Sequence, residues 1–360
     1  MRATNPLHST PQRRLDIDWV RVIALGLLIV YHVTISFQPW ASKLFIIQND
    51  QSLEGLWIVM SLINIWRIPI LFLISGMGVR FSLERRDWKQ LLRERIVRIL
   101  LPLIFGIVFI CPISVFFAMK YYRMNPIYFP NPGHLWFLGN IFLYVLLLLP
   151  LLIYLTKTPT NLVFVFLTKL FRFRFTLFCV ALPFILEAWL VDPDIFSLYY
   201  LTPHGFWIGM VSFLTGFILV SLGDVFWQTV VRIRQFSFIL AFCLYLGRLI
   251  IYQLEEAPNE LIALESVSWM LAIIGYGARY LNSESSSLVY FRKAVFPIYV
   301  IHMPIQFFLS FFLFPVSLPV ILKFLILLTA TLAASLFFYE YVIRPFRWLH
   351  PMFGLKFKRS

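Results

Sequence analysis

Residues 19–38 read WVRVIALGLLIVYHVTISFQ. Arg21 and His32 are the only residues in this stretch that can carry a charge near neutral pH. The hydrocarbon core of a bilayer is about 30 Å thick, and an α-helix needs about 20 predominantly apolar residues to cross it. The stretch therefore predicts a membrane-spanning helix.

Further windows of the same kind fill most of the remaining chain. They are residues 56–83, 96–118, 135–155, 175–191, 205–223, 236–253, 261–281, 294–314 and 318–342. Strand-type alternation in short blocks, which is typical of outer-membrane barrels, is absent from the sequence. We expect an all-α integral membrane protein with about ten transmembrane helices.

The composition excludes a water-soluble globular domain. Charged residues are 13% of the chain and apolar residues are 60%, whereas soluble domains carry about 25% and about 45–50%. The 3 cysteines are far apart and lie in or beside apolar runs, which argues against a disulfide scaffold. No CxxC or HxxxH spacing points to a metal site, so we predict none.

The net charge of +14 is explained mainly by membrane topology. Cytoplasmic loops accumulate Lys and Arg. When both termini are placed in the cytoplasm, most of the Lys and Arg residues outside the windows fall in the loops on the cytoplasmic side. The predicted cytoplasmic cations include Arg2, Arg13, Arg14, Arg85, Arg86, Arg93, Arg95, Arg98, Arg232, Arg234, Arg344, Arg347, Lys356, Lys358 and Arg359. Anionic lipids are the expected partners of this surface, and nucleic acid is not.

The windows divide the chain into one membrane domain and two short tails. We expect an N-terminal cytoplasmic tail over residues 1–14, a polytopic domain over 15–345 and a basic C-terminal cytoplasmic tail over 346–360. No internal repeat or linker stands out between these limits.

Ionisable side chains inside a span are costly and are functional candidates by default. Arg21 and His32 are eleven residues apart, which places them on one helix face about 16 Å apart along the axis, with Asp18 near the same face. Arg21 could hold the phosphates of a coenzyme A molecule while His32 meets its thioester through a shared channel. Imidazole, with an unperturbed pKa of about 6.5, can take a proton from an acceptor hydroxyl and return it to a leaving thiolate. Alternatively, His32 is a buried structural histidine and Arg21 extends to the headgroups.

The second window carries a polar group and a helix breaker in its middle. Pro69 removes a helical hydrogen bond and Gly76 allows close backbone approach, so polar groups are freed there. Arg67 and Ser75 are candidates for stabilising an oxyanion by donating hydrogen bonds. The alternative is a structural kink with Arg67 bonded to the loose carbonyls.

Three further positions combine chemistry with a plainer explanation. Arg95 and Arg98 share a helix face, and arginine matches phosphate oxygens well, although such residues often only anchor topology. His134 and Trp136 open the fourth window, where they could bind substrate or belong to the interfacial belt. His302, between Pro297 and Pro304, is a candidate substrate contact or a structural histidine on a kinked helix.

These motifs in this order resemble the membrane acyltransferase 3 family. The segments that carry the resemblance are Asp18 to His32, Arg67 to Gly76, Arg95 to Pro102, His134 to Leu138 and Tyr339 to Lys356. The last segment is similar to the branch that contains glucan biosynthesis protein C, a glucan succinyltransferase. The resemblance implies that Arg21 and His32 carry catalysis and that Arg95 and Arg98 lie on the acyl-donor side.

The resemblance also implies a reaction and a location. We expect an acyl-CoA-dependent O-acyltransferase of a bacterial inner membrane that moves an acetyl or succinyl group to a cell-envelope glycan. His32 would act as general base or as a transient acyl carrier, with no permanently bound cofactor. The alternative is a transporter or flippase for a glycan or lipid-linked substrate, and the sequence leaves the acyl group, the acceptor and the oligomeric state open.

Overall fold

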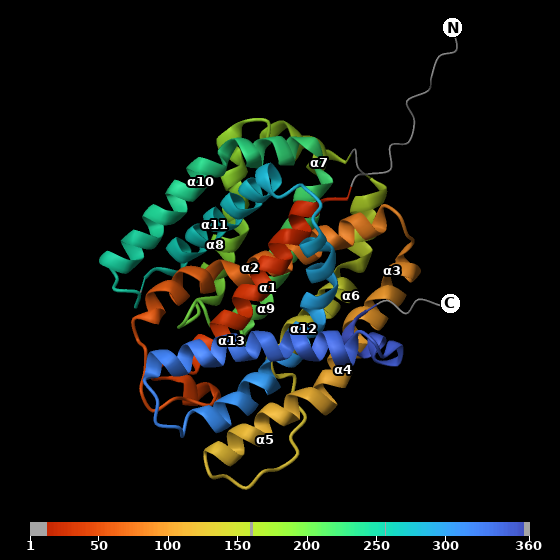
Figure 1. Ribbon diagram of the computed structural model, residues 1–360. Coiled ribbons are helices and arrows are strands. Elements are labelled where there is room, and N and C mark those ends of the chain that lie inside the picture. Colours follow the sequence, from red (N-terminus) through yellow and green to blue (C-terminus); the bar gives the residue numbers. More distant parts are fainter. Residues whose placement is uncertain (1–12, 159–160, 256, 356–360) are drawn as a thin grey trace.

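The computed structural model of the protein describes residues 13–158, 161–255 and 257–355. Throughout these residues, the regular secondary structure is helical (Figure 1). Several of the predicted cytoplasmic cations lie outside the described residues, namely Arg2, Lys356, Lys358 and Arg359, as do residues 1–12 of the predicted N-terminal tail and residues 356–360 of the predicted C-terminal tail.

Within the described residues, 9 helices are long and apolar enough to cross a membrane, as expected for a multi-pass membrane protein. Their bounds are Leu15–Ile35 (α1), Leu56–Leu83 (α2), Trp88–Tyr121 (α3 to α5), Gly133–Lys157 (η4 and α6), Pro203–Ser221 (α9), Asp224–Ile250 (α10), Asn259–Tyr280 (α11), Ser286–Leu313 (α12) and Val320–Ile343 (α13 and η6). The prediction of an all-α membrane fold is confirmed.

The third of these helices is not uniform. It consists of α3 (Trp88–Arg95), α4 (Leu101–Phe105) and α5 (Cys111–Tyr121), and two π-helical segments, Ile96–Leu100 and Gly106–Ile110, join them. Such segments hold an extra residue per turn and are frequent at functional sites in α-helices.

The predicted window 175–191 coincides with one apolar helix, Phe175–Val191, which is shorter than the 9 helices described above. It begins as a 3-10 segment (Arg174–Val180) and continues as α8 (Ala181–Val191). Pro183 has no amide donor and its ring clashes with a preceding α-helical turn, so the α-helix begins just before it. A further short helix, α7 (Leu162–Leu170), precedes this pair.

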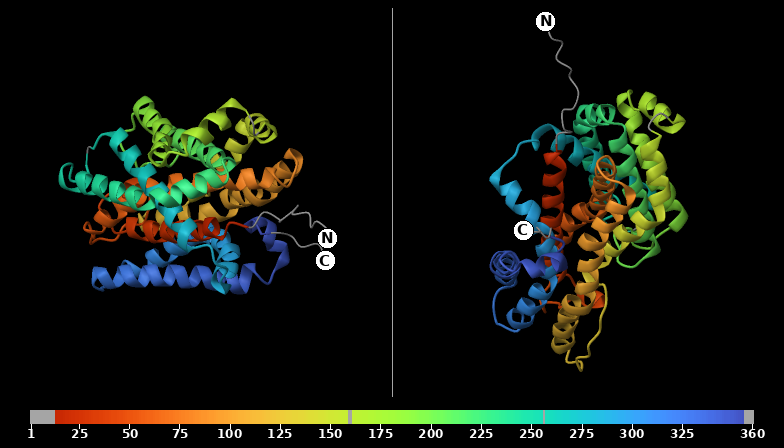
Figure 2. Two further views of the ribbon diagram at one scale, coloured as in Figure 1. Left: turned by 90° about the horizontal axis from the view of Figure 1, so that it is seen from above. Right: turned by 90° about the vertical axis from the view of Figure 1, so that its right-hand side faces the viewer.

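The start of α1 and the C-terminal segment lie toward the same end of the bundle without extensive packing on each other. The C-terminal 3-10 segment η7 (Arg347–Phe353) packs against α4 and the first π segment, and Arg98 Nε donates to the Gly354 carbonyl over 3.4 Å. We call this the basic end, because Arg13, Arg14, Arg21, Arg95 and Arg98 gather there. Figure 2 shows the two chain ends on the same side of the molecule.

The connections 36–55, 122–132 and 192–202 lie at the opposite end. The Tyr122 hydroxyl donates to the Ile46 carbonyl over 2.6 Å, and the Asn64 side chain donates to the Ser197 carbonyl over 3.4 Å. Burial raises the pKa of Tyr122, so its hydroxyl stays a donor at neutral pH. We call this the loop end.

Glycines allow α2 and α9 to touch backbone to backbone. A Cβ on Gly76 would lie 1.8 Å from the Phe213 carbonyl oxygen, and one on Gly216 would lie 1.9 Å from the Leu73 oxygen. Membrane helices gain stability from such close approach because burial of apolar surface drives no association in lipid. The close approach expected at Gly76 is therefore present.

Proline releases a carbonyl in α2, and neighbouring helices satisfy it. Pro69 has no N–H, so the Ile65 carbonyl lacks its helical donor. Two hydroxyls replace that donor: Tyr199 at 3.0 Å and Ser266 at 2.8 Å. Arg67 does not serve the released carbonyl, in contrast to the structural alternative considered from the sequence.

We expect Gly76→Ala to destabilise the protein strongly, because the added methyl collides with backbone that cannot move without separating α2 from α9. The matched control is Gly26→Ala in α1, where a Cβ would meet nothing within 4 Å and helix propensity favours Ala by up to about 1 kcal/mol. Thermal unfolding in detergent should show a lower midpoint for the first variant and an equal or higher one for the second. Equal midpoints for both variants would contradict the packing described.

Candidate active site

A cavity of about 730 Å³ opens among the connections at the loop end and reaches into the bundle. Its walls come from α1, α2, α5, α6 and α12 together with the connections 36–55, 122–132 and 192–202. His32, Arg67, His134, Trp136 and Tyr199 line it. Aliphatic and aromatic side chains make up most of the remaining wall, so the polar groups are few and confined.

Three histidines from three helices meet beside the cavity. His32 of α1 and His302 of α12 are stacked, with ring centroids 5.2 Å apart and planes 8° apart. The ring of His134, from the turn before α6, lies 4.9 Å from that of His302 at 79°. The sequence named all three residues as candidates but did not indicate that they form one cluster.

Hydrogen bonds define the proton positions of the neutral pair. His302 Nδ1 lies 2.7 Å from the Tyr299 carbonyl oxygen, which can only accept, so this nitrogen carries the proton. His302 Nε2 is then an acceptor, and His32 Nδ1 donates to it over 2.9 Å. The remaining nitrogen of His32, Nε2, is left with a free lone pair on a residue that lines the cavity.

A second proline in α12 fixes His134. Pro304 cannot donate to the Val300 carbonyl, and His134 Nε2 lies 3.1 Å from that oxygen and 3.0 Å from the Tyr299 oxygen. The Tyr299 hydroxyl donates in return to the His134 carbonyl over 2.6 Å. His134 is therefore fixed to α12 by three hydrogen bonds and is more than an interfacial belt residue.

Arg67 is the most buried charge at the cavity. Arg67 is only 2% exposed. Its Nη2 donates to Asn64 Oδ1 over 3.2 Å, and its guanidinium lies 3.8 Å from the centre of the Tyr31 ring. Within the described part of the chain, its Nε and Nη1 have no hydrogen-bond partner. Cation–π contact with Tyr31 offsets part of the cost of burying this charge.

Tyr199 closes the cavity from the 192–202 connection, and the sequence did not single it out. Burial raises the pKa of Tyr199 well above its ordinary value, so its hydroxyl remains protonated and donates to Ile65. Its ring stacks on His204, with centroids 5.5 Å apart.

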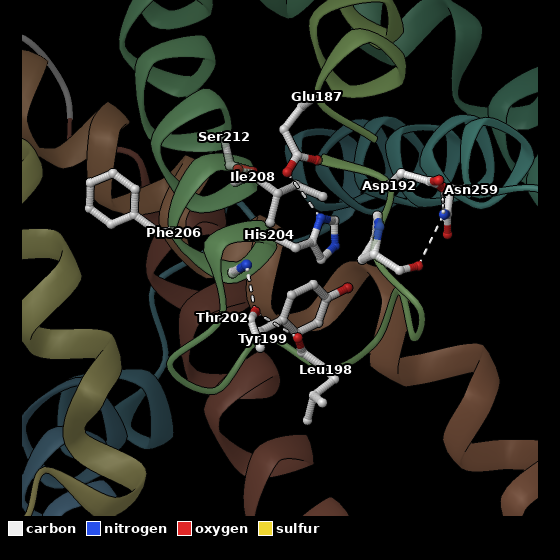
Figure 3. A network of polar contacts seen from close by, with 12 residues as sticks. Glu187, Asp192, Leu198, Tyr199, Thr202, His204, Phe206, Ile208, Ser212 and Asn259 are labelled. Carbon is white, nitrogen blue, oxygen red and sulfur yellow. Dashed lines mark hydrogen bonds and ion pairs between the residues drawn. The ribbon is translucent and has the colours of Figure 1, made fainter. Parts of the chain in front are cut away.

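Several polar contacts, of which the His204–Glu187 pair is buried, position this connection, as Figure 3 shows. His204 Nδ1 pairs with Glu187 Oε1 over 3.0 Å, and both residues are almost fully buried. Thr202 accepts the Gly205 amide at the start of α9, and Asn259 donates to Asp192 over 3.1 Å. His204 lies in the first turn of α9, and its pair with Glu187 joins α9 to α8.

The cations assigned to the acyl donor gather at the basic end. Arg21, Arg95 and Arg98 lie close enough to repel one another electrostatically. Arg98 also pairs with Glu94 over 3.0 Å, and Arg95 Nε has no partner among the described residues. Asp18 is likewise at this end, where it pairs with Arg13 over 2.6 Å and with Arg21 over 3.5 Å.

The expected shared channel is not present in this conformation. Arg21 is not among the described residues that line the cavity, and neither are Asp18, Arg95, Arg98 or Ser75. The Ser75 hydroxyl donates to the Leu71 carbonyl over 2.7 Å within its own helix. Leu25 and Ile29, which lie between Arg21 and His32 along α1, are both buried and do not line the cavity.

The bundle and the cavity define a multi-pass membrane protein with an internal imidazole site. The chain belongs to the acyltransferase 3 family: the family model described as an acyltransferase domain matches residues 14–340. The match includes all three histidines, Arg67 and, at the basic end, Arg14, Arg21, Arg95 and Arg98. No curated protein and no solved structure matches the chain, so the similarity to the glucan succinyltransferase branch stays a prediction.

We expect Glu187→Ala to loosen the 192–202 connection, because it leaves the buried His204 Nδ1 without a partner at a cost of about 1–3 kcal/mol. Limited proteolysis and hydrogen exchange should detect faster cleavage and exchange in this segment. Glu187→Gln, which retains an acceptor, is the matched control and should stay close to the wild type. Unchanged exchange in the alanine variant would show that the pair does not hold the segment.

Proposed function

We propose that the protein is a membrane O-acyltransferase that moves an acetyl or succinyl group from cytoplasmic acyl-CoA to a hydroxyl of a cell-envelope glycan. Family membership supports acyl transfer. The hydrogen-bond chain from the Tyr299 carbonyl through His302 to His32 is the observation that carries the proposal, because it leaves a basic nitrogen free at the cavity.

His32 Nε2 acts as the general base. It takes the proton from the acceptor hydroxyl as the hydroxyl oxygen attacks the thioester carbonyl carbon, and a tetrahedral oxyanion forms. When the carbon–sulfur bond breaks, the same nitrogen returns the proton to the leaving thiolate. His302 Nε2 accepts a hydrogen bond from His32 Nδ1 throughout the reaction, and this bond orients the His32 ring and stabilises its imidazolium form.

The same free nitrogen supports the second form of the mechanism. In that form Nε2 attacks the thioester itself, the carbon–sulfur bond breaks, and an acyl-imidazolium carries the group while the thiolate leaves. The acceptor hydroxyl then displaces the imidazole, and the proton that it loses neutralises the thiolate, so that the net products are the ester and the free thiol. Both forms need His32 Nδ1 to be a donor, and so both depend on His302.

Arg21, Arg95 and Arg98 would bind the phosphates of acyl-CoA at the basic end, which the positive-inside rule places in the cytoplasm. The extended arm of coenzyme A must then reach His32 through an interior that is packed in this conformation. We propose that the helix Trp88–Tyr121 moves to open this path, since its two π segments interrupt regular α-helical bonding beside the cavity and the arginines. The glycan would enter from the loop end.

We expect His32→Ala to abolish acyl transfer while the protein remains folded in the membrane. His302→Ala should lower the rate about 10²-fold or more, because the His32 ring loses the acceptor that fixes its tautomer. The assay is thiol release from acetyl-CoA or succinyl-CoA that depends on added glycan, with mass spectrometry of the glycan. Acyl transfer at the wild-type rate by His32→Ala would rule out the mechanism.

Arg95→Gln should raise KM for acyl-CoA about tenfold with little change in kcat, because it removes a phosphate contact that does not change during the reaction. S-acetylpantetheine lacks the nucleotide phosphates, so the wild type and the variant should use it equally. Arg292→Gln, which removes a cation paired loosely with Glu284 at 3.9 Å, is the control and should leave both substrates unaffected. Equal losses with both donors would argue against a phosphate site at Arg95.

A further inference from the structure

Two arginines are buried in the interior of this bundle, and only one of them is paired with a carboxylate among the described residues. Arg248 is 5% exposed and pairs with Glu265 through two bonds of 2.8 and 3.1 Å, with a third bond of 3.0 Å to the Ser61 carbonyl. Arg67 is 2% exposed, and no carboxylate among the described residues lies within ion-pair distance of it. The fold compensates one buried cation fully and leaves the other with only Asn64 and the Tyr31 ring.

The surroundings of Arg67 do not supply the missing charge. The described residues that line its cavity include no Asp and no Glu, and the other cation among them is Lys43 in the 36–55 connection. An uncompensated guanidinium in a membrane interior costs several kcal/mol. Its Nε and Nη1 are buried and have no partner in the described part of the chain. Arg67 is one of the residues that line the cavity, so an anion in the cavity would lie beside the guanidinium and could take up these donors after a small rotation of the side chain.

We propose that Arg67 binds a carboxylate or phosphate group that the substrate carries permanently, so that the cavity selects an anionic substrate. This inference rests on the proposed acyl transfer and extends it to the substrate class. A transient oxyanion would leave the charge uncompensated in the resting complex, whereas a permanent anion neutralises it as soon as the substrate binds. The anion belongs either to a dicarboxylic acyl group, such as succinyl, or to the acceptor.

Binding can be measured without turnover. Thermal unfolding of the full-length protein in lipid nanodiscs would be followed with succinate, inorganic phosphate or the neutral isostere succinamide at constant ionic strength. We expect succinate, phosphate or both to raise the midpoint saturably, and succinamide to leave it unchanged. If neither anion raises the midpoint, or if succinamide raises it equally, the proposal is overturned.

Arg67→Met separates a binding role from a structural one. Removing an uncompensated buried charge should leave the midpoint without ligand equal or higher, while the anion-induced shift disappears. Arg67→Lys, which keeps the charge, should retain a reduced shift if Arg67→Met fails to fold. Lys43→Gln is the matched control and should keep most of the shift. A full anion-induced shift of the midpoint in Arg67→Met would overturn the proposal. If Arg67→Met does not fold, a full shift in both Arg67→Lys and Lys43→Gln would overturn it.

Kinetics identify which substrate carries the anion. If the acyl group carries it, Arg67→Met should lower transfer from succinyl-CoA at least tenfold more than transfer from acetyl-CoA. If the acceptor carries it, both donors should suffer equally while the anion shift of the wild type is still present. Equal losses without any anion shift would assign Arg67 to the oxyanion alone and overturn the proposal. Failure of the acyltransferase proposal is distinct, since it appears as no thiol release by the wild type.

Discussion

Every backbone carbonyl released inside an apolar bundle must find another donor, and this requirement organises the candidate site. Pro69 releases the Ile65 carbonyl, which draws Tyr199 and Ser266 onto α2. Pro304 leaves the Val300 carbonyl without its helical donor, and His134 donates a hydrogen bond to it. Two of these side chains, Tyr199 and His134, also line the cavity, so the helix breaks and the site are directly connected.

Hydrogen-bond pairing in the bundle also explains the chemistry proposed for His32. A carbonyl oxygen can only accept a hydrogen bond, so the Tyr299 carbonyl fixes the proton of His302 on Nδ1. His302 Nε2 must then accept from His32 Nδ1, which leaves His32 Nε2 without a proton. No charged group is needed to orient the base, which suits a low-dielectric interior. Arg248 is buried and paired with Glu265, and the buried Lys323 donates to the Phe314 carbonyl and to Asn49. Arg67, at the cavity wall, is left with two unpartnered donors among the described residues.

Much of the architecture and several site residues could be predicted from the chain alone. Apolar windows identify spans because a helix must fill the bilayer thickness, and ionisable residues within spans such as His32, Arg67 and His302 stand out by their cost. Tyr199 and Glu187 gave no such signal, since a tyrosine in a connection and a glutamate in a short helix are ordinary residues. The window 175–191 matches the helix Phe175–Val191, but a window average does not register that this helix opens as a 3-10 segment before Pro183.

The sequence by itself determined that the chain is helical, membrane-spanning and basic on one side, because hydropathy and charge act locally along the chain. It also determined which residues could do chemistry. Only the tertiary structure decided that three histidines from separate helices share one cluster and that the Arg21 end is separated from His32 by packed side chains. Contacts between residues 270 positions apart, such as His32 with His302, depend on how helices pack, and no local pattern encodes that.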